Sequence, residues 1–211
     1  MSYSQSRAGV ITYSDRASVA ITFSDYNHYE EFKIALEALP YHGKTTRIDK
    51  AIVKASTELM TRRGGKREDI PGVLVIMTDG RQTPDLDLTP LEEAATSLEK
   101  LGVTTLVLGI GELADEKELR KMTARDGAVF LAPSLQSLSS FVRPLSSSIC
   151  AAAGMRSALC PLLRVNSLFC FLYILMYGLG KCCHTSIKFL YISFYDLSYV
   201  WQSHKMLQGF M

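Results

Sequence analysis

Thr78, Asp79 and Gly80 are the strongest candidates for chemistry in this sequence. They follow five apolar residues in a row, Val73 to Met77. An unbroken apolar run of this length is typical of a strand that is covered on both faces of a parallel sheet. Ligands of open α/β sheets bind beside the carboxyl ends of such strands. The Asp79 carboxylate is therefore placed to bind a ligand, although its alternative role is simply to cap the turn.

An enzyme that uses Asp79 with magnesium, such as a phosphohydrolase on a doubly wound fold, is one alternative. That chemistry needs a second carboxylate or a nucleophile nearby. Asp85 and Asp87 lie in the next loop, but the sequence shows no basic cluster to partner them. We therefore expect a protein that is not an enzyme, and keep the phosphohydrolase as the competing hypothesis.

Alternating strand and helix patterns surround this candidate. Two short β-type runs near residues 8–13 and 18–23 predict a hairpin, and apolar runs at 73–77 and 103–110 predict buried strands. Helical patterns follow at 29–39, 47–61, 90–101 and 134–142, a further short helix opens at 115–118, and a last short strand is expected at 128–131. Thr89-Pro90-Leu91-Glu92 has the spacing of a capping box, and so has Asp115 with Glu118. This order favours an α/β fold with helices on both faces of a mainly parallel sheet.

Three segments taken together resemble a von Willebrand factor type A domain. They are Arg7–Ser14 with Val19–Phe23, then Tyr41–Ile52, and finally Val73–Gly80 with Leu106–Gly111 downstream. The resemblance covers about residues 7–142 and is strongest to the domains of matrilins and fibril-associated collagens. It implies a three-layer α/β/α, Rossmann-like fold that is mostly parallel with one antiparallel edge hairpin.

The resemblance also implies a metal-ion-dependent adhesion site. In this family a divalent metal at the top of the sheet accepts a carboxylate from the partner protein. The family's metal-binding threonine matches Thr46, with Thr45 as the less favoured register, and its aspartate matches Asp79. Magnesium prefers about six oxygen ligands, which loop hydroxyls and carboxylates can supply. Arg47 and Asp49 are expected to be charges of the first helical turn.

The sequence departs from the family at the first metal-binding loop. No Asp-x-Ser-x-Ser motif precedes Arg7. We expect the domain to be amino-truncated and to lack the usual first strand, so that Mg²⁺ is bound weakly or not at all. Because the missing strand is central in the family's sheet, its two neighbours are expected to have unpaired edges.

The resemblance implies an extracellular adhesion module that binds matrix proteins such as collagen. The predicted contact surface consists of Thr45, Gly80, Arg81 and Gln82 beside the metal-binding residues Thr46 and Asp79. A metal-independent scaffold is the other alternative. An extracellular location rests on the resemblance alone, since the residues after Met1 do not have the pattern of a signal peptide.

The charge distribution divides the sequence near residue 144. The formal net charge is only +2, which gives no electrostatic argument for nucleic-acid binding. The residues through Arg143 include 18 basic and 20 acidic side chains, whereas the remainder has five basic residues and one acid. All five cysteines lie in the second part. We therefore predict a partial type A domain at 1–143 and an apolar, cysteine-containing tail at 144–211.

Three interpretations of the tail remain open. Residues 165–180 are apolar but slightly shorter than the roughly 17–25 residues that span a bilayer, so they are a marginal membrane anchor. Alternatively, the tail is a cysteine-bearing extension for an oxidising compartment. The interpretation we favour is non-native sequence without a selected structure. A second apolar patch, at 189–201, is a poorer membrane candidate.

Overall fold

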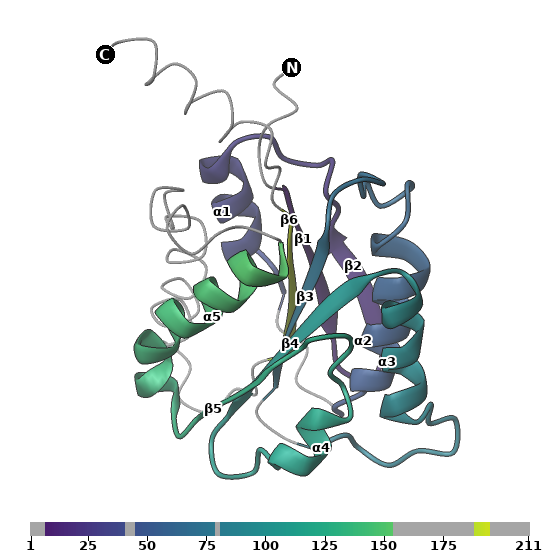
Figure 1. Ribbon diagram of the computed structural model, residues 1–211, viewed down its shortest axis with the longest axis vertical. Helices are drawn as coiled ribbons and strands as arrows, with labels where there is room; N and C mark the ends of the chain where they lie inside the picture. Colours follow the sequence, from purple (N-terminus) through teal and green to yellow (C-terminus); the bar gives the residue numbers. More distant parts are fainter. Residues whose placement is uncertain (1–6, 41–44, 79–80, 154–187, 195–211) are drawn as a thin grey trace.

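The sheet has six strands in the order β2-β1-β6-β3-β4-β5 (Figure 1). The computed structural model describes residues 7–40, 45–78, 81–153 and 188–194. The strands are β1 (Arg7–Tyr13), β2 (Ala17–Ile21), β3 (Gly72–Thr78), β4 (Val103–Ile110), β5 (Val129–Ala132) and β6 (Lys188–Phe194). β3, β4 and β5 pair in parallel, and β1 and β2 form an antiparallel hairpin at one edge. The predicted α/β fold with an edge hairpin is confirmed.

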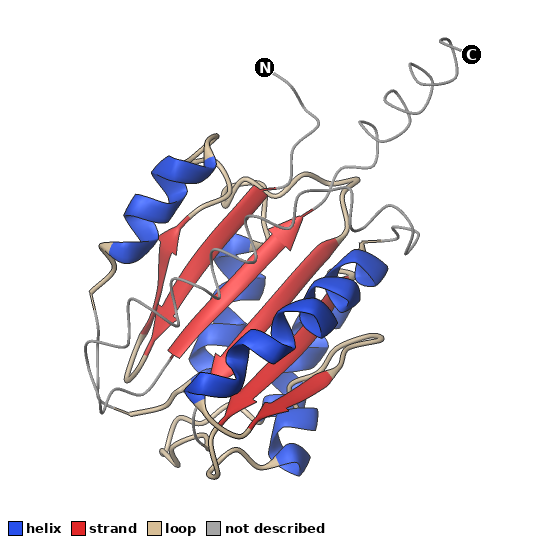
Figure 2. Cartoon of the chain, turned by 90° about the vertical axis from the view of Figure 1, so that its left-hand side faces the viewer, coloured by secondary structure: helices blue, strands red, loops and turns tan. Residues whose placement is uncertain are grey.

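Helices cover both faces of this sheet (Figure 2). They are α1 (Tyr29–Glu37), α2 (Ile48–Lys54), α3 (Leu91–Lys100), α4 (Glu116–Arg120) and α5 (Leu138–Ala152). A π-helical turn, Ala55–Leu59, extends α2, and a 3-10 turn, Leu135–Ser137, precedes α5. One hydrophobic core lies under α1 and α5, and a second lies under α2, α3 and α4. The molecule therefore has the three layers that the resemblance implied.

β3 has apolar side chains on both faces of the sheet, so both helical layers are required to bury them. All seven of its residues are buried. Val75 and Met77 belong to the core under α1 and α5, whereas Leu74 and Ile76 belong to the core under α2 and α3. Successive side chains of a strand point to opposite faces, so the unbroken apolar run fills both cores.

The position between β1 and β3 is occupied by β6. This strand pairs antiparallel with both neighbours, with Val10 and Val75 each opposite Tyr191. The expectation that these neighbours have unpaired edges is therefore wrong, because residues far along the chain pair with both of them. Residues 188–194 are apolar at nearly every position, a pattern that suits a strand covered on both faces.

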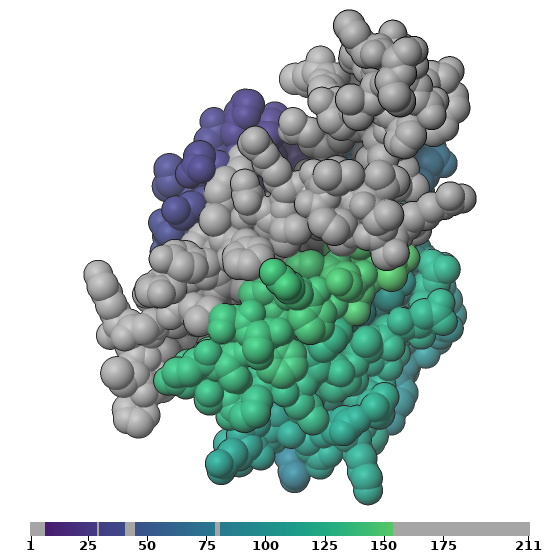
Figure 3. Space-filling model, turned by 60° about the vertical axis from the view of Figure 1, so that its left-hand side comes forward, coloured from purple at the N-terminus to yellow at the C-terminus, as the bar shows by residue number. Residues whose placement is uncertain are grey.

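α5 is longer than the sequence predicted. The expected helix at 134–142 continues to Ala152, and Pro144 lies inside it. Leu145 and Ile149 are buried in the core, which explains why the helix persists despite the backbone hydrogen bond that proline removes. Figure 3 shows α5, in green, lying against the teal residues that precede it in the sequence. The helix thus crosses position 144, where the charge distribution changes.

None of the helices in the described ranges is long and apolar enough to cross a bilayer. The candidate membrane segment at 165–180 lies outside the described residues.

Candidate functional site

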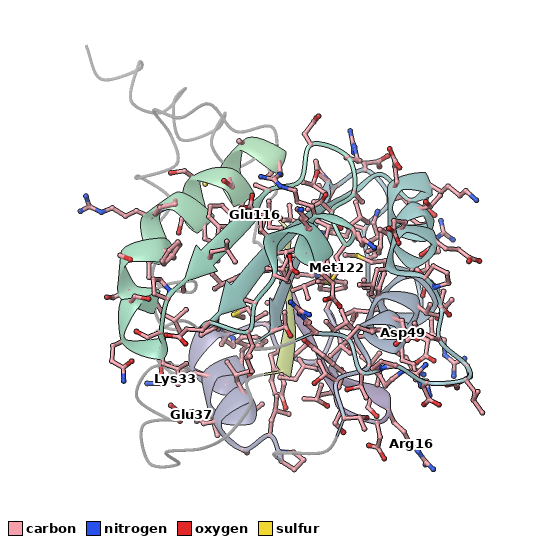
Figure 4. The ribbon with its side chains drawn as sticks, turned by 90° about the horizontal axis from the view of Figure 1, so that it is seen from below. Arg16, Lys33, Glu37, Asp49, Glu116 and Met122 are labelled. Atoms are coloured by element: carbon pink, nitrogen blue, oxygen red, sulfur yellow. The ribbon has the colours of Figure 1, made fainter. Side chains whose placement is uncertain are left out.

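The carboxyl ends of β1, β3 and β4 meet at one end of the sheet. β6 is antiparallel to both β1 and β3, so these two strands run in the same direction. α4 follows β4 at this end, which is the lower end in Figure 1. Figure 4 views the molecule from below and labels Asp49 of α2, Arg16 in the turn after β1 and Glu116 of α4. We call this end of the sheet the carboxyl edge.

Two loops at the carboxyl edge are joined by a reciprocal pair of hydrogen bonds. The Thr46 amide donates to Thr83 Oγ1 at 2.9 Å, and the Thr83 amide donates to the Thr46 carbonyl at 2.9 Å. The Arg47 amide also donates to the carbonyl of Ser14, in the turn after β1, at 3.0 Å. Thr46 is therefore fixed between the turn after β1 and the loop after β3, while Thr45 beside it is exposed.

Arg47 anchors the same loops from below the surface. Its side chain is only 2% exposed, and all five of its N–H groups donate. Nε and Nη2 form a two-pronged bond to the Asp49 carboxylate at 3.0 and 2.8 Å. Nη1 donates to Asp85 and to Asp87 at 2.6 Å each, and Nη2 reaches the Asp87 carbonyl. One guanidinium thus holds the start of α2 to the 81–89 loop, and we call these four residues the Arg47 cluster.

The charges of the Arg47 cluster stabilise one another. The hydrogen bonds that Arg47 donates to the Asp49 carboxylate raise the pKa of Arg47. Burial acts to raise the pKa of Asp49, but hydrogen bonds from Arg47 and from the Thr89 and Lys50 amides outweigh it and lower the pKa. Hydrogen bonds from Arg47 and Lys50 lower the pKa of Asp87 to about 2. Arg47, Asp49 and Asp87 therefore stay charged near neutral pH.

The cluster corrects two sequence-based expectations. Asp85 and Asp87 do have a basic partner, because Arg47 lies beside them although it is 38 and 40 residues away in the chain. Thr89 does not cap α3: the helix begins after Pro90 without a side-chain cap, and the Thr89 amide donates to Asp49 instead.

Arg81 and Gln82 connect the site to α4. Arg81 Nη2 donates to Asp115 at 3.2 Å, and the Gln82 amide donates to Glu118 Oε1 at 2.9 Å. Gln82 Oε1 in turn accepts from the Asp49 amide at 3.1 Å. Asp115 caps α4 as the sequence predicted, but Glu118, its partner in the predicted box, bonds the 81–89 loop. Gln82 Nε2 is buried and has no acceptor among the described residues.

The structure brings together most of the residues predicted from the sequence. Thr45, Thr46, Arg81 and Gln82 all lie on the carboxyl edge, whereas Asp79 and Gly80 lie outside the described residues. The sequence did not reveal the bracing roles of Arg47, Asp49, Thr83 and Glu118. Their only signal was their polar type, which does not say which loops they connect.

The described residues do not by themselves fit a magnesium ion. Thr46 offers one hydroxyl, but the neighbouring carboxylates are already bound: Asp49, Asp85 and Asp87 to Arg47, and Glu118 to the Gln82 amide. Within the part of the chain that the structure describes, no three histidine, cysteine, aspartate or glutamate side chains gather in a way that could hold a metal. Mg²⁺ prefers about six oxygens, which these groups do not supply.

Comparison with known families gives one match over most of the chain. A family model described as the von Willebrand factor type A domain matches residues 1–144.

Comparison with individual proteins gives relatives from the extracellular matrix. The chain is 25% identical to the human collagen alpha-1(XXI) chain over 59% of its own length, and 26% identical to mouse matrilin-2 over 69%. These matches span only 12% and 15% of the two relatives. Among solved structures, proximal thread matrix protein 1 of the mussel byssus, with a zinc-occupied MIDAS motif, superposes with a TM-score of 0.57. That similarity has 25% identity over 65% of this chain and 33% of that one.

Proposed function

The chain belongs to the von Willebrand factor type A family, and on that basis we propose that it is an adhesion module of the extracellular-matrix type. Its partner is a matrix protein such as collagen, and its contact surface is the carboxyl edge. The matrix relatives support this class of partner, although the chain spans only a small part of their length. An extracellular location also suits Cys150, which is disulfide-bonded.

The observation that carries this proposal is the bracing of the carboxyl edge. The Thr46–Thr83 pair and the Arg47 cluster hold two loops that are far apart in sequence. A surface that is ordered before binding loses little conformational entropy when a partner docks. Arg81, 67% exposed, and the exposed Thr45 offer polar groups at its rim. A partner's carboxylates and carbonyls are suitable acceptors for the Arg81 guanidinium.

Thr46 and Asp79 are the proposed metal position, and we propose that it is degenerate. The described donor groups support this because the carboxylates beside Thr46 are bound to Arg47 and to backbone amides. Adhesion is therefore expected to depend on the protein's own side chains, with Mg²⁺ contributing little.

Binding of the full chain to immobilised collagen tests this proposal. Arg81→Ala should weaken binding about tenfold, the loss expected for one charge-assisted contact. Lys100→Ala is the matched control, because Lys100 is an exposed cation at the end of α3, remote from the carboxyl edge. Binding should persist in EDTA. Equal effects of the two substitutions would place the contact elsewhere, and complete loss in EDTA would show an intact metal site.

A further inference from the structure

We propose that the space between β1 and β3 is a strand-binding site, which the chain fills with its own segment Lys188–Phe194. The ligand class of this site is an extended apolar peptide that runs antiparallel to both neighbours. The same peptide, supplied separately, should bind when the internal segment is released. This site is distinct from the adhesion surface of the carboxyl edge.

The register of β6 is continuous on both sides. Against β1 it runs from Arg7 opposite Phe194 to Thr12 opposite Phe189. Against β3 it runs from Val73 opposite Ser193 to Thr78 opposite Lys188. A strand that pairs along its whole length with two neighbours behaves as an inserted strand, the arrangement by which extended peptides augment sheets.

β1 and β3 require a strand between them to pair their facing edges. β3 is buried along its whole length, and Val10 and Ile11 of β1 are fully buried. Without β6, both strands would present unpaired N–H and C=O groups inside the molecule, where water cannot satisfy them. A bound strand satisfies both edges at once, which explains why an apolar segment from distant sequence is recruited.

A second observation connects α5 to the rest of the chain. Cys150, near the end of α5, is 5% exposed and disulfide-bonded. The four other cysteines, Cys160, Cys170, Cys182 and Cys183, all precede Lys188 and lie outside the described residues. The disulfide therefore joins α5 covalently to another cysteine of the chain, and all of these cysteines lie between α5 and β6 in the sequence.

Engineered cysteine pairs in the full chain test directly whether Lys188–Phe194 lies between β1 and β3. Val73 and Ser193 lie opposite each other, so Val73→Cys with Ser193→Cys places two thiols in register with little change in side-chain size. Val75→Cys with Ser193→Cys is the matched control, since Val75 lies opposite Tyr191, two residues out of register. We expect about tenfold more of the 73–193 crosslink than of the 75–193 crosslink, because disulfides tolerate only short Cα separations.

The crosslink must also form within one chain. Mixed ¹⁴N- and ¹⁵N-labelled protein, digested and analysed by mass spectrometry, distinguishes links within a chain from links between chains. Same-chain 73–193 peptides support the proposal. Equal yields for the two pairs, or links mainly between chains, would overturn the proposal that the chain's own segment fills the site.

Release of the strand tests the binding site itself. A protease site inserted between Cys183 and Lys188 allows β6 to be cut free after the chain has folded. A labelled Lys188–Phe194 peptide should then bind the cut chain but not the uncut chain. The same peptide with Ile192→Pro should bind far more weakly, because proline removes a ladder donor opposite Gly9 and Leu74. Equal binding of both peptides, or no binding to the cut chain, would overturn the strand-binding site.

Discussion

At the scale of single residues, Arg47 determines how the candidate site is held. Its guanidinium is buried and balanced by Asp49, which is also buried, and by Asp85 and Asp87 at the surface. Removing one partner of a buried ion pair leaves an uncompensated charge, which costs more than the pair itself contributes. The cluster therefore maintains the loop geometry more than it adds to net stability.

Arg47→Leu should lower the free energy of unfolding by about 3–5 kcal/mol, because Asp49 would lose its counter-charge in the interior. Urea denaturation of the purified chain measures this loss. Arg63→Leu is the control, since Arg63 is exposed and should change stability by less than about 0.5 kcal/mol. Equal losses for the two variants would contradict the anchoring role of Arg47.

The low pKa of Asp87 predicts how the cluster responds to acid. The folded pKa, about 2, lies below the ordinary value of 3.8, so the unfolded chain binds a proton more readily between these values. The contribution of Asp87 to stability is therefore complete above pH 3.8 and disappears as the pH falls toward 2. The difference in urea midpoint between the unmodified chain and Asp87→Asn should shrink over this range. A difference that is constant with pH would contradict the assignment.

The candidate contact surface was predictable from sequence only as far as residue types allow. Thr46, Arg81 and Gln82 are brought to one edge because strand ends and loop order follow from local patterns. The Arg47 cluster could not be foreseen, because its bonds to Asp85 and Asp87 join loops separated by α2 and β3. Local sequence patterns do not indicate which distant residues form such pairs.

At the scale of elements, local patterns predicted the strands well. β4 has the predicted bounds, Val103–Ile110, because a long apolar run between two turn signals leaves little ambiguity. β6 was missed because its apolar run resembles a membrane or tail segment until its partners β1 and β3 are known. α5 was predicted too short: the expected helix ended at Val142, whereas burial of Leu145 and Ile149 sustains the helix past Pro144.

Gly109 of β4 shows how closely α4 packs on the sheet. A Cβ atom at this position would lie 2.5 Å from Leu119 Cδ1 and 2.8 Å from Ala114 Cβ. Gly109→Ala should therefore push α4 outward and destabilise the chain by about 1–3 kcal/mol. Because Glu118 of α4 accepts from the Gln82 amide, hydrogen exchange at Gln82 should also accelerate.

Urea denaturation and amide exchange of Gly109→Ala measure the two effects. Lys117→Ala is the control: Lys117 is exposed on the same helix, so this substitution should leave both the stability and the Gln82 exchange rate unchanged. An unaltered Gln82 exchange rate in Gly109→Ala would show that α4 does not position the loop after β3.

At the scale of the whole molecule, the disulfide of Cys150 is part of the fold. A disulfide in a folded domain typically contributes about 2–5 kcal/mol. A reducing agent should therefore lower the thermal midpoint of the unmodified chain but leave Cys150→Ser unchanged. Equal midpoints with and without reductant in the unmodified chain would contradict this contribution.

The central claim, that the carboxyl edge binds a matrix protein, is tested most directly by an NMR titration of the ¹⁵N-labelled chain with a triple-helical collagen peptide. The amide signals of Thr45, Thr46, Arg81, Gln82 and Thr83 should shift as the peptide is added. Those of Leu101, Gly102 and Arg125, at the opposite end of the strands, should not shift. Shifts confined to the opposite end, or no shifts at saturating peptide, would contradict the account.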